Sequence, residues 1–307
     1  MSLAILFPGQ GSQYVGMGRS LATDYPAAAR IFEEADEILG FGISKLAWEG
    51  PEDELVLTKN VQPALLVHSA AMYRVIRDRI GEVGMAAGHS LGEFSAHLAA
   101  GTMDFNEALR TVRLRGELMF SAGVARPGTM AAVLGLPDEK VESVCLLASR
   151  EAGTCVPANF NCEGQVVISG DMTGVRRAME FAEEAGARRV VPLTVSGAFH
   201  SPLMGPAEEG LRNWLDEVNF RDPMFPVIAN TTAEPVSTAE EARRLLVRQL
   251  TAPVRWADSV RRMIALGADR FVELGPGSVL RGLNRRNAKG FPCESLGESS
   301  DIEAWED

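Results

Sequence analysis

The residues with the clearest potential for chemistry form the pentapeptide Gly88-His89-Ser90-Leu91-Gly92. A short apolar run at 84–87 precedes it and predicts the end of a buried strand. The small and apolar residues from Leu91 to Gly101 predict a short helix. A strand, G-x-S-x-G and a helix are typical of a nucleophile elbow, in which a tight turn projects the serine over the positive end of the helix. The pattern therefore predicts Ser90 as a nucleophile, with unpaired helix N–H groups nearby that can stabilise an oxyanion.

A serine nucleophile needs a general base within hydrogen-bond reach, and the chain has four histidines. His89 is next to the serine in the turn, so its ring should point away from the hydroxyl. His97 lies about two helical turns downstream, and His68 lies on the apolar stripe of a helix predicted within 51–80, typical of a core histidine. His200, in a loop at 196–202, is the predicted base by elimination. A group that orients the histidine ring is also expected, but no single Asp or Glu stands out.

Arg115 lies on a helix that begins with a predicted capping box, Asp104 and Glu107, and extends to about Phe120. Helical spacing places Arg115 on a mostly apolar face of that helix. A buried guanidinium needs an anionic partner, because an unpaired buried charge is costly. That partner is either a ligand carboxylate or an acid of the chain itself, and the pattern leaves both open.

The N-terminal strand predicted at Ser2–Phe7 is followed by the loop Pro8-Gly9-Gln10-Gly11-Ser12-Gln13. A glycine-rich loop after a first strand suggests a nucleotide site. However, Tyr14 stands where the third glycine of a dinucleotide motif would be, and the lysine of a P-loop is missing. The loop is instead expected to bring its backbone N–H groups close to a neighbouring site.

Strands and helices alternate along most of the chain, which predicts an α/β fold with a mostly parallel sheet. One segment, 129–195, has the order βαββαβ and is predicted to be an inserted ferredoxin-like unit. Asn159 and Asn161 are expected near a cleft between this unit and the rest of the protein. The elements expected in the insert are strand 129–136, helix 138–149, strands 154–160 and 165–169, helix 173–185 and strand 189–195. Those expected after it are helix 203–218, strand 225–230, helices 238–250 and 256–266, strand 270–274 and helix 278–286.

The composition excludes several classes of protein. The 307 residues include 30 Lys and Arg against 41 Asp and Glu, so the net charge of −11 argues against general nucleic-acid binding. No signal-peptide pattern and no membrane-spanning apolar run is present, which predicts a cytoplasmic protein that does not bind membranes. The four cysteines lack metal-site spacing, so reduced thiols and no metal are expected. The acidic tail at 294–307 is predicted to be solvated surface.

Several longer motifs resemble the malonyl-CoA:acyl carrier protein transacylases and the related acyltransferase domains of polyketide synthases. In chain order, these motifs are FPGQGSQ, GHSLGEFSAHLAAG, VRLRGELM, NFNCEGQVVISG, GAFHSPLM, QLTAPVRW and ELGPG. The resemblance implies an α/β-hydrolase-like catalytic subdomain formed by 1–126 and 197–307, with a ferredoxin-like subdomain at 127–196.

The resemblance also assigns roles to individual residues. Ser90 matches the acylated serine and His200 its base, with the backbone carbonyl of Gln249 as the group that orients the histidine. Arg115 matches the arginine that binds the malonyl carboxylate. Three further matches are the oxyanion-hole N–H groups of Gln10 and Leu91, and Phe199 in the acyl pocket, where Leu91 and Phe199 fit the malonyl-selective pattern.

The activity implied is ping-pong transfer of a malonyl group from malonyl-CoA to the phosphopantetheine thiol of an acidic acyl carrier protein in fatty acid synthesis. The CoA thioester is then a substrate, and no cofactor is expected. The alternatives are a trans-acting acyltransferase of a polyketide synthase, a serine thioesterase or hydrolase, and a catalytically idle carrier-protein-binding subunit. A hydrolase would not need the arginine, and it usually places its histidine near the C-terminus.

An acidic enzyme needs a local basic patch to dock an acidic carrier protein. The densest basic group lies at the last predicted helix and just after it. An ordinary solvated helix face remains the alternative interpretation. The group comprises Arg281, Arg285, Arg286 and Lys289, and a second candidate on the insert comprises Arg188 and Arg189.

Overall fold

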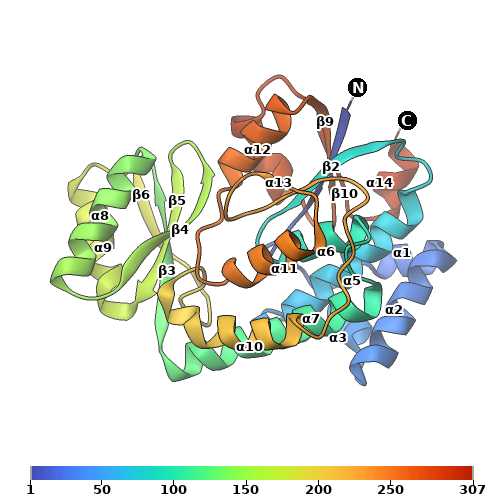
Figure 1. The fold of residues 1–307 in the computed structure, drawn as a ribbon, viewed down its shortest axis with the longest axis horizontal. Coiled ribbons are helices and arrows are strands. Elements are labelled where there is room, and N and C mark those ends of the chain that lie inside the picture. Colours follow the sequence, from blue (N-terminus) through green and yellow to red (C-terminus); the bar gives the residue numbers. More distant parts are fainter. Residues whose placement is uncertain (1, 306–307) are drawn as a thin grey trace.

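The computed structural model describes residues 2–305 and has two parts, each built on its own sheet (Figure 1). The larger part holds a six-stranded sheet with helices on both faces. The smaller part, green to yellow in Figure 1, holds a four-stranded sheet with two helices. This is the parallel α/β core with an inserted antiparallel unit that the sequence predicted.

The large sheet has the strand order β10-β9-β1-β2-β7-β8, and its strands are parallel except for β8. The central strand β1 is buried from Leu3 to Phe7, because a parallel strand covered on both faces needs a continuous apolar run. Pairing of Phe7 with Gly88 brings the carboxyl ends of β1 and β2 together. The strands are β1 (Ser2–Phe7), β2 (Val83–Gly88), β7 (Val227–Ile228), β8 (Pro235–Val236), β9 (Ala268–Leu274) and β10 (Cys293–Leu296).

The helices of the large part place most of the functional side chains. Helix α7 begins with the predicted capping box, in which the Asp104 side chain accepts from the Glu107 N–H and the Glu107 side chain accepts from the Asp104 N–H. It then packs along α5. The helices are α1 (Arg19–Asp24), α2 (Pro26–Leu39), α3 (Ile43–Glu49), α4 (Glu52–Leu55), α5 (Thr58–Ile76), α6 (Leu91–Ala99), α7 (Phe105–Ala125), a 3₁₀ turn (Pro202–Met204), α10 (Gly205–Leu215), α11 (Ala239–Arg248), α12 (Trp256–Ala265), α13 (Val279–Asn287) and α14 (Ser299–Ala304).

The small sheet is antiparallel in the order β4-β5-β3-β6. Its two helices pack on one face, over a core that includes Ala131, Val133 and Ile168. The elements follow the predicted βαββαβ order and lie inside 127–196. They are β3 (Gly128–Leu134), α8 (Asp138–Glu151), β4 (Cys155–Cys162), β5 (Gln165–Asp171), α9 (Met172–Glu184) and β6 (Arg189–Pro192).

The acidic tail departs from its prediction. Residues 294–305 are not simply solvated surface, because β10 forms one edge of the large sheet and α14 follows it. Leu296, Ile302 and Trp305 are buried among the core side chains. Between them, Glu303 is exposed, while Glu298 and Asp301 are half-buried and accept hydrogen bonds. Buried apolar residues therefore alternate with polar ones along the tail, and the high charge of the tail obscured this pattern. Positions 1, 306 and 307 lie outside the described residues.

Smaller differences concern element boundaries. Apolar periodicity also predicts one helix over 15–40, but Tyr25 and Pro26 divide this segment into α1 and α2, since proline cannot donate to the preceding turn. The strand predicted at 225–230 shrinks to the two residues of β7. The pattern did not reveal α3. Among the described residues, none of the helices combines the length and apolarity that a membrane crossing requires.

Candidate active site

The elbow is formed as predicted, with only His89 and Ser90 between β2 and α6. Ser90 has φ 52° and ψ −105°, a conformation that non-glycine residues rarely adopt and that the surroundings must enforce. The flanking glycines are sterically required. A Cβ at Gly88 would lie 1.9 Å from the Gly92 carbonyl carbon, and one at Gly92 would lie 2.0 Å from the Phe7 oxygen. The turn is therefore packed directly against the end of β1.

The side chain of Asn230, just after β7, stabilises the backbone of the elbow through hydrogen bonds. The sequence pattern did not predict this residue. Its Oδ1 accepts from the Ser90 N–H at 2.7 Å, and its Nδ2 donates to the Gly88 carbonyl at 2.7 Å. The side chain thus satisfies backbone groups that the sharp turn leaves without helix or sheet partners. An isolated asparagine after a two-residue strand gave no signal in the sequence.

His200 occupies the position expected of the base. Its Nε2 lies 2.8 Å from Ser90 Oγ, and its Nδ1 lies 2.8 Å from the Gln249 backbone carbonyl. Because a carbonyl only accepts, Nδ1 carries the proton and Nε2 is left with the lone pair that can take the serine proton. Burial, followed by the charge of Arg115, lowers the pKa of His200 to about 3, so the ring is neutral at physiological pH.

The other three histidines are engaged elsewhere. His89 Nε2 lies 2.9 Å from the Asn161 Oδ1, so its ring points away from the serine hydroxyl, as predicted. His97 is buried, with Nδ1 3.1 Å from the Thr102 hydroxyl. His68 is buried within α5, in agreement with its interpretation as a core residue.

Arg115 projects from α7 to the Ser90 hydroxyl and is 1% exposed. Its Nη1 donates to Gln62 Oε1 at 2.6 Å, while Nη2 donates to Gln249 Oε1 at 2.8 Å and to Ser90 Oγ at 3.2 Å. Among residues 2–305 no carboxylate lies within salt-bridge distance of it, which contradicts the alternative of a direct internal salt bridge. Burial lowers the pKa of Arg115 to about 10, partly offset by the charge of Glu93, so the guanidinium stays protonated at neutral pH.

Two neutral side chains that align this cation were not anticipated. Gln62 is buried on α5, and the Gln249 side chain is buried at the C-terminus of α11. A glutamine inside the apolar stretch of α5 was the available signal for the first. Only the backbone carbonyl of Gln249 was expected to act, and its side chain binds the arginine in addition.

The two N–H groups expected to form an oxyanion hole are free. Leu91 begins α6, and neither its N–H nor that of Gln10 has an acceptor among the described residues. The N-terminal loop lies directly against the elbow, since a Cβ at Gly9 would be 2.3 Å from the His89 oxygen. Both donors also border the cavity that contains the Ser90 hydroxyl.

A small cavity of about 120 Å³ contains the reactive groups. Apolar side chains, including Met119, Met130 and Phe199, line it together with Arg115. A groove of about 470 Å³ shares part of this wall and continues between the two parts of the protein. Asn159 and Asn161 border the groove, as predicted from their place in the insert, together with Leu280 and Leu283 of α13.

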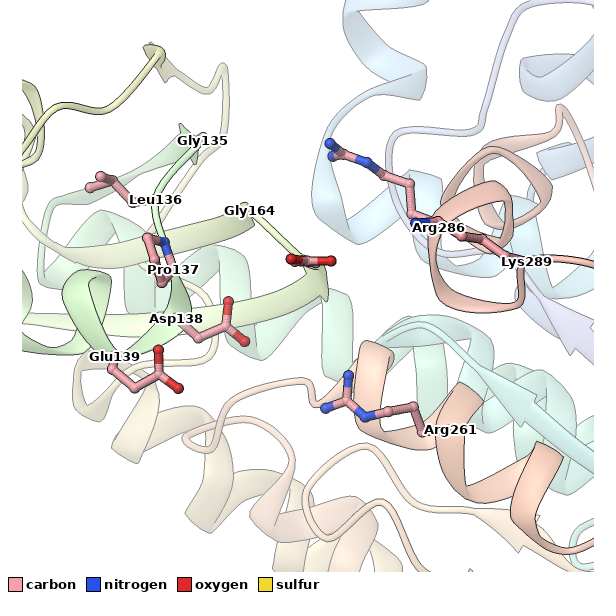
Figure 2. Close-up of a pocket in the computed structure, with 10 residues that line it drawn as sticks. Gly135, Leu136, Pro137, Asp138, Glu139, Gly164, Arg261, Arg286 and Lys289 are labelled. Carbon is pink, nitrogen blue, oxygen red and sulfur yellow. The ribbon is translucent and has the colours of Figure 1, made fainter.

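The predicted basic patch lies beside that groove. Arg281, Arg285, Arg286 and Lys289 are all exposed at α13 and just beyond it. Arg286 and Lys289 also border a separate cavity of about 640 Å³ between the two parts of the protein. Figure 2 shows the acidic side chains Asp138 and Glu139 on the wall opposite these basic residues. The alternative patch, Arg188 and Arg189, is exposed as well, on the small subdomain.

No group of three or more His, Cys, Asp or Glu side chains within residues 2–305 could hold a metal ion. The reactive constellation consists instead of a serine, a neutral histidine and a buried guanidinium. It can activate an oxygen nucleophile, stabilise an oxyanion and hold an anionic substituent a few ångströms from the bond that reacts.

Comparison with known proteins gives concordant results over nearly the whole chain. Residues 5–299 match the acyl transferase domain family. The chain is 44% identical to a malonyl CoA-acyl carrier protein transacylase of Bacillus subtilis, over 98% of this chain and 95% of the relative. It is 42% identical to the Escherichia coli K12 protein of the same name, over 98% and 97%. The structure resembles an acyl carrier protein S-malonyltransferase of Vibrio cholerae with a TM-score of 0.96, at 41% identity over 99% of both chains. It also resembles a malonyl-transacylase solved with a type II polyketide synthase acyl-carrier protein, with a TM-score of 0.94 at 39% identity, over 99% and 98%.

Proposed function

The chain belongs to the malonyl-CoA:acyl carrier protein transacylases of the acyl transferase family, and from this premise we propose that it transfers malonyl groups through an ester of Ser90. The donor is malonyl-CoA, and the acceptor is the phosphopantetheine thiol of an acyl carrier protein. The transfer takes place in two steps, and the same pocket serves both halves of the reaction.

In the first step, Ser90 Oγ attacks the thioester carbonyl while His200 Nε2 takes its proton, across the 2.8 Å that separates the two atoms. The N–H groups of Gln10 and Leu91 receive the developing oxyanion. CoA then leaves as the thiol, with the proton returned by His200. In the second step, the carrier thiol gives its proton to His200 and attacks the malonyl ester, and Ser90 regains its proton as it leaves.

The observation that carries the malonyl assignment is the buried guanidinium of Arg115, 3.2 Å from the nucleophilic oxygen. A free carboxylate two carbons from the thioester carbonyl can pair with it bidentately and fix the acyl group for attack. A thioesterase acting on neutral acyl chains gains nothing from a buried cation at this place.

Intact-protein mass spectrometry after mixing with malonyl-, methylmalonyl- and acetyl-CoA tests the proposal. We expect one malonyl adduct on the wild type, little acetyl adduct and no adduct on Ser90→Ala. A malonyl adduct that persists on Ser90→Ala would mean that another residue is the nucleophile. Rapid loss of the adduct to water without carrier protein would favour the thioesterase instead.

A second candidate keeps the chemistry and changes the pathway. The structure resembles a malonyl-transacylase solved with a polyketide synthase carrier protein, and this observation supports a role in polyketide assembly as the second candidate. Specificity constants measured with a fatty acid carrier protein and a polyketide carrier protein separate the two roles. Fatty acid synthesis is our primary assignment, and a marked preference for the polyketide carrier would reverse it.

A further inference from the structure

Glu93 is a buried carboxyl group that the proposed steps do not use. It lies in the first turn of α6, beneath the nucleophile, with an exposed fraction of 0%. Its Oε2 accepts from the Gln249 Nε2 at 2.6 Å and from the Asn230 N–H at 3.2 Å. Its Oε1 has no hydrogen-bond partner among the described residues. A carboxylate in this environment requires a positive charge nearby.

The Gln249 amide connects Glu93 to such a charge. Its Oε1 accepts from Arg115 Nη2 at 2.8 Å, while its Nε2 donates to Glu93. The opposite orientation of the amide would place NH₂ against a guanidinium and oxygen against a carboxylate, so both charges fix it in one direction. Arg115 and Glu93 thus form a buried pair of opposite charges with a single amide group between them.

Arg115 is the charged group whose field acts on Glu93. The adjacent strands β1, β2 and β7 carry no charged side chain. On α6 itself, burial lowers the pKa of His97 to about 3, and on α5 burial lowers the pKa of His68 to about 4, so both are neutral. Lys59 of α5 lies over the Phe120 ring. On α11 the half-buried Arg243 donates to the Val218 carbonyl and lies over the Phe220 ring. The fully buried side chains before Gln249 are all apolar: Ala242, Leu245, Leu246 and Val247.

We propose that Glu93 is the resident counter-charge of Arg115 and takes up a proton when a malonyl carboxylate binds the arginine. Without substrate, the buried pair is neutral overall. A malonyl carboxylate adds one negative charge to the same dry pocket, and protonation of Glu93 from solvent restores neutrality while the two substrate oxygens take over the guanidinium. No substrate bond changes in this step. An acetyl group brings no charge, so it leaves Glu93 ionised.

Two features support protonation of this group rather than another. Burial raises the pKa of Glu93 to about 7, against the opposing effects of two N–H donors and Arg115, so the proton is available near neutral pH. Its Oε1 has no N–H donor that a proton would displace. Arg115 remains protonated throughout, because its pKa is about 10.

The inference rests on the proposed binding of malonyl at Arg115, and calorimetry of the Ser90→Ala protein tests it without any change at Glu93. Malonyl-CoA and acetyl-CoA are titrated at pH 8 in buffers of different ionisation enthalpy. We expect malonyl-CoA binding to take up as much as about one proton more per molecule than acetyl-CoA binding. Acetyl-CoA carries the same CoA phosphates, so the difference between the two ligands removes their contribution. Malonyl-CoA binding with no such difference would overturn the inference, while covalent malonylation of the wild type would still support the proposed function.

The pH dependence of affinity gives a second measurement. In Ser90→Ala, the malonyl-CoA dissociation constant should rise above pH 7 by up to about tenfold per unit, because binding then requires a proton. Adding Glu93→Gln, whose side-chain oxygen can accept the same two N–H groups, should flatten this dependence. The matched control is Glu117→Gln, a half-buried acid on α7 paired with Arg113, which should leave the slope unchanged. An equal slope with and without Glu93 would refute its role.

Discussion

At the scale of single residues, the site relies on neutral partners for its two most important groups. A backbone carbonyl orients His200, and two glutamine side chains align Arg115. A carboxylate in direct contact with His200 would raise its pKa and could pair directly with Arg115, so it would compete with the substrate carboxylate. The uncharged partners hold both groups in position without occupying the anion site.

Arg115 should control which acyl group is accepted. Arg115→Ala removes the charge-assisted hydrogen bonds to malonyl, about 1.5–3 kcal/mol each, so malonyl kcat/KM should fall by at least about 10²-fold. The apolar space left behind suits a methyl group, so the ratio of acetyl to malonyl specificity constants should rise. Arg115→Lys should restore part of the malonyl rate, since a single ammonium cannot hold both oxygens in plane. Equal losses for both substrates would indicate a structural role for the arginine.

His200 should remain an effective base at mildly acidic pH. Its lowered pKa of about 3 keeps the ring neutral at pH values where an ordinary histidine is charged. The acylation rate at saturating malonyl-CoA should therefore stay nearly constant from pH 8 to 5.5, where an ordinary histidine would lose about tenfold. Rapid-quench measurement across this range checks the prediction. His200→Ala should slow acylation by about 10²–10⁴-fold at every pH, and a wild-type decline centred near pH 6.5 would contradict the assignment of the pKa.

At the scale of elements, the elbow works because β1, β2 and α6 approach one another more closely than side chains allow. Gly88 and Gly92 remove the Cβ atoms that would separate them. The same close approach places the N-terminal loop against the turn, so two separate segments can each supply an N–H group to one oxyanion.

Gly92→Ala should therefore damage both stability and catalysis. The new methyl would meet the Phe7 oxygen at 2.0 Å, so the strand and helix must separate, at a cost of about 1–3 kcal/mol. Displacement of Ser90 by an ångström should reduce acylation by about 10²-fold. Gly282→Ala is a suitable control, because it lies in exposed α13 with no heavy atom within 4 Å of the new Cβ and should raise stability by about 0.5–1 kcal/mol. Denaturant unfolding and the acylation rate test both variants, and a Gly92→Ala protein as stable and active as the wild type would contradict this account.

At the scale of the whole molecule, the acyl pocket opens toward the junction of the two subdomains. The groove runs past α13, whose Leu280 and Leu283 line it while Arg281 and Arg285 face solvent. A phosphopantetheine arm that enters along this groove would leave its carrier protein beside the basic residues. The net charge of −11 makes such a local patch necessary for docking an acidic partner.

Charge reversal of Arg285 and Arg286 should raise KM for the carrier protein by about 3–10-fold and leave KM for malonyl-CoA unchanged, because long-range attraction affects the protein partner most. Steady-state kinetics with each substrate varied in turn measures both constants. The same reversal at Arg188 and Arg189 serves as the comparison. A larger effect there would move the docking site to the small subdomain, and equal effects on both substrates would exclude the α13 patch.

The sequence alone predicted most of the elements before the tail, the βαββαβ insert and the strand–turn–helix elbow that presents Ser90. These features depend on local patterns: the period of apolar residues, the capping box at Asp104 and the glycine spacing around Ser90. His200 followed from the few histidines available. The sequence also showed that Arg115 lies on an apolar face, because helical geometry fixes the direction of a side chain relative to its neighbours.

Only the tertiary structure decided what each of these groups contacts. The side chains that support the site come from four separate elements, and no spacing along the chain relates them. They are Gln62 of α5, Asn230 just after β7, Glu93 of α6 and Gln249 at the end of α11. The choice between a ligand and a direct internal salt bridge for Arg115 depended on whether a carboxylate comes into contact with it. Strand β10 joined the sheet although the tail that contains it is rich in acids. Such contacts are set by the packing of distant elements, whereas local sequence encodes only what each element presents to them.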